Sequence, residues 1–396
     1  MQQEHQEASP ERSAPYSPEP RILHVIHGLE FDGGIEVWLL HLLRHIDRRS
    51  YPTDVLVLNT PGGALEGDFR SLGCRIFYCP ERNPWSVRRH LARILADHGP
   101  YDIVHSHVHH FGGMVLRIAA RQGAPIRIVH SRNDTRRAER DAGPLRRVYT
   151  RLMRRWIERY ATCRVAISVS AAEDLFGLGW RDSCTIVHSG RDFSSFGRSG
   201  QGGQVRQSLG IPQDALVLGH VGKFHRRKNH AMVIDVAAEV VRREPRTRVL
   251  LVGHGREQGP THERARAAGI ADRVVFAGAR NDVPQLMEHA MDVLVFPSHH
   301  EGLGLAVVEA QAAGLPCVIA DHLPGEIDVV PRLIRRLPLS AAPAGWASAV
   351  LSAASERRID AAEALAAILA TDFNIERSVG KIAQIYDQER DGLGRG

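Results

Sequence analysis

Two glutamates with seven residues between them, Glu301 and Glu309, are the first candidates for chemistry in this chain. They lie between the strand-like run VLVFPS and the helix-forming run EAQAAG. Eight residues of helix rise roughly 12 Å, whereas the acid and base of a glycoside hydrolase hold their carboxyl groups about 5 to 9.5 Å apart. The spacing therefore favours two contacts at opposite ends of one extended ligand over a hydrolytic pair.

The residues Gly302, Leu303 and Gly304 occupy the predicted turn from strand to helix between these glutamates. The first backbone amides of a helix have no partner within the helix, and such amides bind phosphate. We expect the amides of Gly302 and Leu303 to hold a phosphate or a sugar oxygen.

A basic loop follows another strand-like run in the segment LVLGHVGKFHRRKNH, which contains Gly222, Lys223 and Lys228. Two cations on a loop that glycine keeps open can stabilise a departing diphosphate without a metal ion. A solvated basic turn is the alternative interpretation of the same residues.

Together, the two segments resemble the donor site of retaining glycosyltransferases of family 4, which have the GT-B fold. The resemblance implies that Lys223 and Lys228 neutralise the diphosphate of a nucleotide-sugar. It assigns Glu301 to hydroxyls of the transferred sugar and Glu309 to the ribose hydroxyls. Family members usually have arginine at the position of Lys223, and lysine offers a point charge in place of a two-pronged guanidinium.

The similarity extends from Arg21 to about Tyr386 and is to the members that build bacterial exopolysaccharides and capsules. Four further segments carry it, namely HSRND, DLFG, GARNDVPQLM and EAQAAGLPCVIAD. The segment HSGRD stands where relatives have Asn-Gly-x-Asp, so the turn keeps Gly190 and Asp192 but lacks the asparagine.

A glycine pair, Gly33 and Gly34, lies in the loop HGLEFDGGIE before the amphipathic run WLLHLLRHI. Glycine lets the backbone approach a ligand, and amides at a helix start could meet a phosphate or an acceptor oxygen. A plain turn explains the pair nearly as well. The resemblance favours binding, because family members carry a Gly-Gly loop here followed by a small residue and a glutamate; Glu36 matches and Ile35 departs.

A histidine cluster lies in the segment YDIVHSHVHHFGG. His105, His107 and His109 alternate along a predicted strand and so share a face, which raises the alternative of a three-histidine metal site. The resemblance instead implies metal-independent chemistry without a cofactor and places His107 at a strand end, projecting into a cleft near the transferred sugar. His105 then belongs to the core, and His109 and His110 face the acceptor.

Apolar runs of strand length alternate with helical stretches along the whole chain. They are RILHVI, TDVLVL, CRIFY, YDIVHS, IRIVHS, RVAIS and CTIVH, then LVLGHV, RVLLVG, RVVFAG, DVLVFP and PCVIA after the gap GRSGQGG. This alternation, with the resemblance, predicts an α/β GT-B fold of two Rossmann-like domains facing across a cleft. The expected parts are a disordered tail at 1–20, an N-terminal acceptor-side domain at 21–196, a linker at 197–213, a C-terminal nucleotide-sugar-binding domain at 214–370, and a helix at 371–388 that in the family crosses back to the N-terminal domain.

Composition excludes several other classes of protein. With 396 residues, 43% of them hydrophobic, the chain can fill two cores. It has no run of 18 apolar residues, and its first twenty residues lack the apolar region of a signal peptide. The five cysteines form no Cys-x2-Cys pair, which favours a reducing cytoplasm and argues against structural zinc.

Positive charge is concentrated between Arg136 and Arg159, where nine arginines face three acidic residues. Apolar residues recur there at helical spacing, at Leu145, Val148, Leu152 and Trp156. Such a basic amphipathic helix is either the solvated face of an ordinary helix or a surface that docks on an anionic bilayer. Nucleic acid is a less fitting partner, since the segment lacks a recognisable nucleic-acid module.

The sequence therefore predicts a retaining glycosyltransferase that moves a sugar from a UDP-sugar to a lipid-linked or saccharide acceptor in cell-surface polysaccharide synthesis. Its expected location is the cytoplasm, including the inner face of the cell membrane. Two other classes stay open. A nucleotide-sugar epimerase of GT-B fold needs no acceptor, and a non-catalytic membrane scaffold releases no nucleotide.

Overall fold

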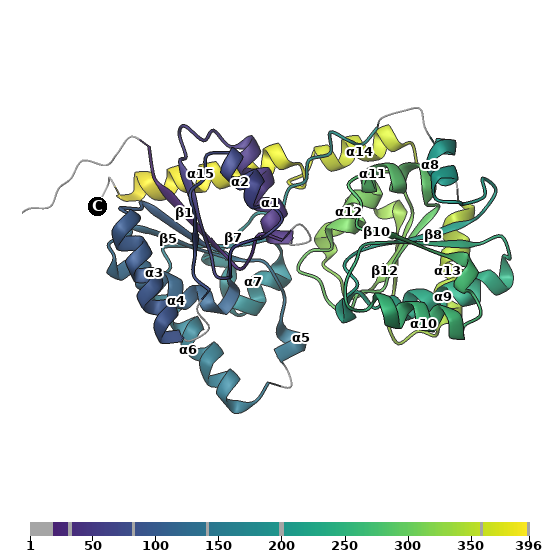
Figure 1. The fold of residues 1–396 in the computed structure, drawn as a ribbon, viewed down its shortest axis with the longest axis horizontal. Coiled ribbons are helices and arrows are strands. Elements are labelled where there is room, and N and C mark those ends of the chain that lie inside the picture. Colours follow the sequence, from purple (N-terminus) through teal and green to yellow (C-terminus); the bar gives the residue numbers. More distant parts are fainter. Residues whose placement is uncertain are drawn as a thin grey trace, which may run out of the picture.

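The computed structural model describes residues 19–30, 34–80, 84–139, 142–197, 202–356 and 359–393. Within them the chain forms two parallel sheets, each covered by helices, which stand side by side in Figure 1. Three predicted features lie outside the described residues: Gly33, the tail at residues 1–18 and residues 198–201 of the linker. In the described part of the chain, no helix is long and apolar enough to cross a membrane.

The first domain is built on a sheet of order β3-β2-β1-β4-β5-β6-β7, in which each described pairing is parallel. Both faces of such a sheet are covered, and every residue of β1 is buried. The strands are β1 (Ile22–Ile26), β2 (Thr53–Val57), β3 (Ile76–Tyr78), β4 (Ile103–Ser106), β5 (Ile126–Ser131), β6 (Cys163–Ala166) and β7 (Thr185–Ile186). The helices are α1 (Gly34–His45), α2 (Glu66–Ser71), α3 (Pro84–His98), α4 (Gly112–Arg121), α5 (Arg136–Glu139), α6 (Pro144–Tyr160) and α7 (Val169–Phe176).

The second domain is built on a parallel sheet of order β10-β9-β8-β11-β12-β13. Its strands are β8 (Val217–Val221), β9 (Arg248–Val252), β10 (Val274–Gly278), β11 (Val293–Phe296), β12 (Cys317–Ala320) and β13 (Ile334–Leu337). Its helices are α8 (Gly202–Ser208), α9 (His230–Arg243), α10 (Gln258–Ala267), α11 (Val283–Gln285), α12 (Leu305–Ala312), α13 (Pro343–Ser355) and α14 (Ala361–Leu369).

The last helix, α15 (Ile375–Leu393), returns to the first domain and lies along it in Figure 1. Its apolar side chains share a core with α1 and are Ile375, Val379, Ile382, Ile385 and Tyr386. The chain thus passes between the domains twice. The two passages touch, because Arg191 and Asn374 form a parallel β-bridge.

These strand orders confirm the prediction of two Rossmann-like α/β domains. Each sheet has a switch point, between β1 and β4 in the first domain and between β8 and β11 in the second. Ligands of open parallel sheets bind beyond the carboxyl ends of the strands at such points. The loops after β8 and β11, which carry the predicted lysines and Glu301, follow the strands at the second switch point.

Candidate active site

Lys228 and Glu301 form an ion pair at the switch point of the second sheet. Their Nζ and Oε1 atoms are 2.7 Å apart, and each residue is only 9% exposed. Burial raises the pKa of Glu301, but the charges of Lys228 and Arg227 and hydrogen bonds outweigh it and hold this pKa below its ordinary value. The carboxylate therefore stays ionised beside the ammonium group.

Gly222, in the turn after β8, has no side chain and therefore leaves room for the side chain of Lys228. A Cβ atom at Gly222 would lie 3.1 Å from Cε and 3.2 Å from Cδ of Lys228. Any larger residue would displace the lysine stem. Lys223, in the same turn, is exposed.

The glycine turn before α12 packs against the first domain. A Cβ atom at Gly302 would lie 2.4 Å from the carbonyl oxygen of Arg132, and the Ser168 hydroxyl donates a hydrogen bond to the Gly302 carbonyl at 2.7 Å. Gly304 adopts φ 87°, a left-handed conformation that favours glycine. Gly302 and Leu303 are both buried, so in this structure their turn meets protein from the other domain.

Glu309 faces a cavity between the domains. The cavity measures about 570 Å³, and the described residues that line it include Gly34, Arg191, Gly222, Lys223 and Glu309. The Nε atom of Arg191 lies 3.0 Å from Oε1 of Glu309. Burial raises the pKa of Glu309, while Arg191 and Lys228 oppose this shift.

The structure thus gathers some of the sequence-predicted residues around one cavity and leaves others beside it. The predicted residues that do not line it are His107, Lys228, Glu301, Gly302 and Leu303. Sequence reasoning missed Arg191 and Arg280, which do line it. The signal for Arg191 was its place within HSGRD, between Gly190 and Asp192, the two residues of this turn that match the family.

His107 lies inside the first domain, 1% exposed, which differs from the expectation that it projects into the cleft. Its backbone amide donates to the carbonyl of Val25 on β1 at 2.9 Å, and its Nε2 lies 2.9 Å from Nδ1 of His24 on the same strand. Arg132 Nε donates to His107 Nδ1 at 3.4 Å. The ring therefore turns inward because the backbone continues its pairing with β1 beyond the end of β4.

The histidines of the predicted metal-site alternative separate into two clusters. His105 and His107 group with His24, whereas His109 groups with His110 and Asp174. Each group brings three possible ligand atoms within 4.8 Å of one another, and the rings of His105 and His107 stack with centroids 4.3 Å apart. Burial, then the charges of His105 and Arg132, holds the pKa of His107 well below its ordinary value.

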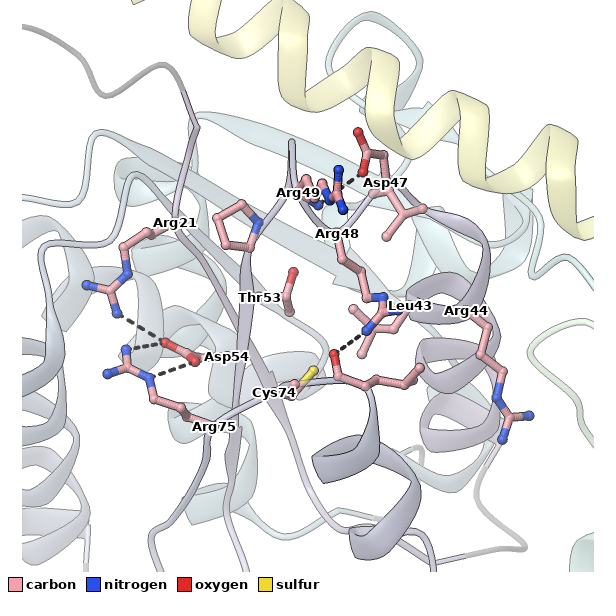
Figure 2. Close-up of a pocket in the computed structure, with 14 residues that line it drawn as sticks. Arg21, Leu43, Arg44, Asp47, Arg48, Arg49, Thr53, Asp54, Cys74 and Arg75 are labelled. Carbon is pink, nitrogen blue, oxygen red and sulfur yellow. Dashed lines mark hydrogen bonds and ion pairs between the residues drawn. The ribbon is translucent and has the colours of Figure 1, made fainter.

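A second cavity, of about 790 Å³, lies at the amino ends of β1, β2 and β3 in the first sheet (Figure 2). Figure 2 shows Arg21 and Arg75 pointing toward Asp54, with nitrogen-oxygen distances of 3.2 and 2.6 Å. None of the residues that the sequence assigns to the donor is among the described residues lining this cavity. Its ion pairs join the starts of neighbouring strands.

Two Rossmann-like domains with a charged cavity between them define the class of GT-B proteins. Comparisons with known proteins support this class. The family model described as "Glycosyl transferase 4-like domain" matches residues 33–190, and the one described as "Glycosyl transferases group 1" matches residues 203–334. The chain belongs to this family of glycosyltransferases.

Three individual proteins illustrate the relationship. EpsF of Bacillus subtilis (strain 168), which carries the name of a glycosyltransferase, is 31% identical over 94% of this chain and 97% of its own length. An Escherichia coli protein named UDP-Gal:alpha-D-GlcNAc-diphosphoundecaprenol alpha-1,3-galactosyltransferase is 26% identical over 56% of this chain and 58% of its own. The crystal structure of Anabaena Alr3699/HepE in complex with UDP has a TM-score of 0.75 at 19% identity, over 93% of this chain and 100% of its own. The protein is a glycosyltransferase of GT-B fold.

Proposed function

We propose that this glycosyltransferase moves a sugar from a UDP-sugar to a lipid-linked glycan in cell-surface polysaccharide synthesis, with retention of the anomeric configuration. The observation that carries the proposal is the interdomain cavity, where the carboxylate of Glu309 lies beside cations. Further support comes from the UDP held by HepE and from the diphosphoundecaprenol-linked acceptor in the name of the E. coli relative.

The reaction that fits these residues needs no protein nucleophile. The bond between the anomeric carbon of the sugar and the diphosphate oxygen breaks, and the acceptor oxygen forms a bond to that carbon on the same face. An oxygen of the leaving diphosphate takes the proton of the acceptor hydroxyl. Lys223 and Lys228 would stabilise the negative charge that grows on the diphosphate. Glu309 would accept hydrogen bonds from the ribose hydroxyls, and Glu301 would contact the sugar and fix Lys228.

The remaining assigned residues have supporting roles in the proposal. The amides of Gly34 and Gly302 and the open turn at Gly222 would admit donor oxygens close to the backbone. Leu303 would contribute its amide, and His107 would act through its backbone, since its ring is buried. Use of the Gly302 and Leu303 amides requires the turn to separate from Arg132.

Calorimetry with UDP tests the division of labour between the two glutamates. Glu309→Gln should weaken UDP binding by about 1.5 to 3 kcal/mol, because a charged acceptor of two hydrogen bonds is lost. Glu301→Gln should leave UDP affinity within a few-fold while turnover falls. Equal defects in UDP binding would contradict the assignment.

Product analysis separates the proposed reaction from its two alternatives. A transferase releases UDP only when an acceptor is present, and NMR of the product shows retention. Conversion of UDP-N-acetylglucosamine without an acceptor would instead establish an epimerase. Absence of UDP release with every sugar nucleotide and acceptor tested would favour a scaffold.

The exposed face of α6 is our proposed docking surface for an anionic bilayer. Leu145, Val148 and Leu152 are 86%, 64% and 42% exposed on this helix, and only Met153 and Ile157 are buried among its described residues. Arginines flank the exposed apolar residues. Such a surface would hold the enzyme at the cytoplasmic face of the membrane, where a lipid-linked acceptor is located.

A further inference from the structure

Arg191 lies where the chain passes between the two domains. Its backbone amide donates to the carbonyl of Phe373 at 2.7 Å, and its carbonyl accepts from the amide of Ile375 at 3.0 Å. Both bonds join the first passage of the chain to the second one. The backbone of Arg191 is therefore fixed at the hinge, independently of either sheet.

The side chain of Arg191 reaches across the cavity to the second domain. Its Nε lies 3.0 Å from Oε1 of Glu309 on α12, and the two side chains are 19% and 21% exposed. Nε makes no aligned hydrogen bond. The contact is thus a charge pair with one carboxylate oxygen of Glu309, at the wall of the interdomain cavity.

Other charged residues line the same cavity, namely Arg44, Asp68, Asp192, Lys223 and Arg280, but the charges that act on the pKa of Glu309 are those of Arg191 and Lys228. His41, which lines the same cavity, has its pKa lowered to about 4, by burial first and then by Arg191, so the ring is neutral near pH 7. Asp192 acts on His41 in the opposite sense. Arg191 is therefore a principal counter-ion of Glu309.

We propose that Arg191 is a positioning residue for the donor, holding the carboxyl group of Glu309 aimed at the ribose position in the interdomain cavity. This inference rests on the proposed UDP-sugar function. Because Arg191 is anchored at the hinge and Glu309 belongs to α12, rotation of one domain changes their separation. The affinity of the protein for the donor therefore depends on how the two domains are arranged relative to each other.

The pH dependence follows from the electrostatics of Glu309. Its pKa is already raised by burial, and loss of Arg191 removes a charge that opposes this shift. A protonated carboxyl is a poorer acceptor for ribose hydroxyls. The loss of affinity in an Arg191 variant therefore grows as the pH falls.

UDP affinity measured by calorimetry at about pH 6 and about pH 8 tests the proposal. Arg191→Gln should weaken UDP binding more at the lower pH than at the higher pH, by up to about tenfold for each unit by which the pKa of Glu309 rises. Arg191→Lys, which keeps the charge, should stay within about threefold of the wild type at both. Arg280→Gln is the matched control, because Arg280 lines the same cavity but pairs with Asp282 of its own domain at 2.6 Å.

A second readout does not depend on any ligand. In protein with carbon-13-labelled glutamate carboxyls, the Glu309 signal is the one that Glu309→Gln removes. Its titration midpoint should move to higher pH in Arg191→Gln and stay in place in Arg280→Gln. An unmoved midpoint would overturn the counter-ion role.

The UDP affinity and the titration of Glu309 together distinguish a failure of the counter-ion role from a failure of the donor role. A shifted titration in a protein that binds no UDP would keep the counter-ion and overturn the donor role, together with the proposed function. Tighter UDP binding in Arg191→Gln would overturn the inference, because it would make Arg191 a competitor of the nucleotide. Equal losses in Arg191→Gln and Arg280→Gln would also overturn it, since they would reflect the overall charge of the cavity.

Discussion

Lys228 and Glu301 are nearly enclosed, and each neutralises the other. Removing one member of such a pair leaves a buried charge without compensation, which costs about 3 to 5 kcal/mol. A single substitution at either position therefore combines an effect on folding with any effect on catalysis. The functional role of Lys228 has to be measured in a background where Glu301 carries no charge.

Lys228→Ala should lower turnover by about 10² to 10³, or about 2.7 to 4 kcal/mol, as for the loss of one preorganised electrostatic donor. Its melting temperature should fall as well. In the double variant Lys228→Ala with Glu301→Gln, the melting temperature should recover while turnover stays well below that of Glu301→Gln alone. Turnover within threefold of the wild type in a folded Lys228→Ala variant would exclude the proposed role at the diphosphate.

For individual residues, the sequence predicts which ones belong to the site better than it predicts which residues they contact. Gly222, Lys223 and Glu309 follow from turn chemistry and spacing within single segments, and the structure places all three at one cavity. The pairs Arg191–Glu309 and Lys228–Glu301 join residues distant in the chain. Such pairs depend on how elements and domains pack, which no local spacing encodes.

Among the elements, the apolar runs predict β1 to β12, and the structure confirms two parallel sheets. The exception is β13 (Ile334–Leu337), where Arg335 and Arg336 interrupt the apolar pattern. This strand lies at the edge of its sheet and each of its residues is only partly buried. An edge strand tolerates charged residues, so hydrophobic patterning alone does not find it.

Asp54, at the start of β2, joins neighbouring strands through Arg21 and Arg75 (Figure 2). It also accepts a hydrogen bond from the hydroxyl of Tyr101 at 2.8 Å. Burial opposes its ionisation, but hydrogen bonds from Arg75, Tyr101 and Arg21 lower its pKa. A carboxyl group whose pKa is lowered by folding stabilises the folded state at pH values above its ordinary pKa. This stabilisation is lost as the pH falls through the pKa that the group has in the folded protein. Asp54→Asn should therefore cost about 1 to 3 kcal/mol near pH 7.

Denaturant unfolding at about pH 7 and about pH 3 checks this sign. The difference between wild type and Asp54→Asn should shrink at the lower pH, because below the ordinary pKa the unfolded wild-type chain binds a proton at Asp54 more readily than the folded protein does. Asp47→Asn is the control, since Asp47 lines the same cavity but is exposed. A constant difference at both pH values would show that Asp54 acts through packing alone.

Three exposed arginines on one side of α6, Arg147, Arg151 and Arg155, line a shallow surface depression. Each basic residue near an anionic bilayer contributes about 1 kcal/mol. Replacing all three by glutamine should lower affinity for phosphatidylglycerol vesicles by about one to two decades. Raised salt should have a similar effect through screening.

Co-sedimentation at low salt beside a melting curve measures this effect. Substitution of Arg242, Arg246 and Arg266 on the second domain removes the same charge and should leave sedimentation nearly unchanged. Wild-type protein that stays in the supernatant would contradict docking through α6. An equal loss of vesicle binding in the second-domain variant would show that the effect depends only on the net charge of the protein.

For the whole molecule, the close approach of Gly302 to Arg132 sets how tightly the domains meet. Gly302→Ala would place a methyl group 2.4 Å from the Arg132 carbonyl oxygen, so the turn or the domain has to move away. We expect a larger radius of gyration in small-angle scattering and a lower turnover. Gly325→Ala is the control, because a Cβ there meets nothing within 4 Å. Superimposable scattering curves for the two variants would show that the turn yields locally.

The position of α15 also has a consequence for the biosynthesis of the protein. The first sheet has emerged once β7 ends at Ile186, yet the side chains that cover it beside α1 come from α15, which starts at Ile375. At about 5 to 20 residues per second, a ribosome needs roughly 10 to 40 s to make the intervening stretch. During that interval the apolar surface that α15 later covers is open to solvent and to chaperones, so the domain that is translated first is completed only after the second one has been made.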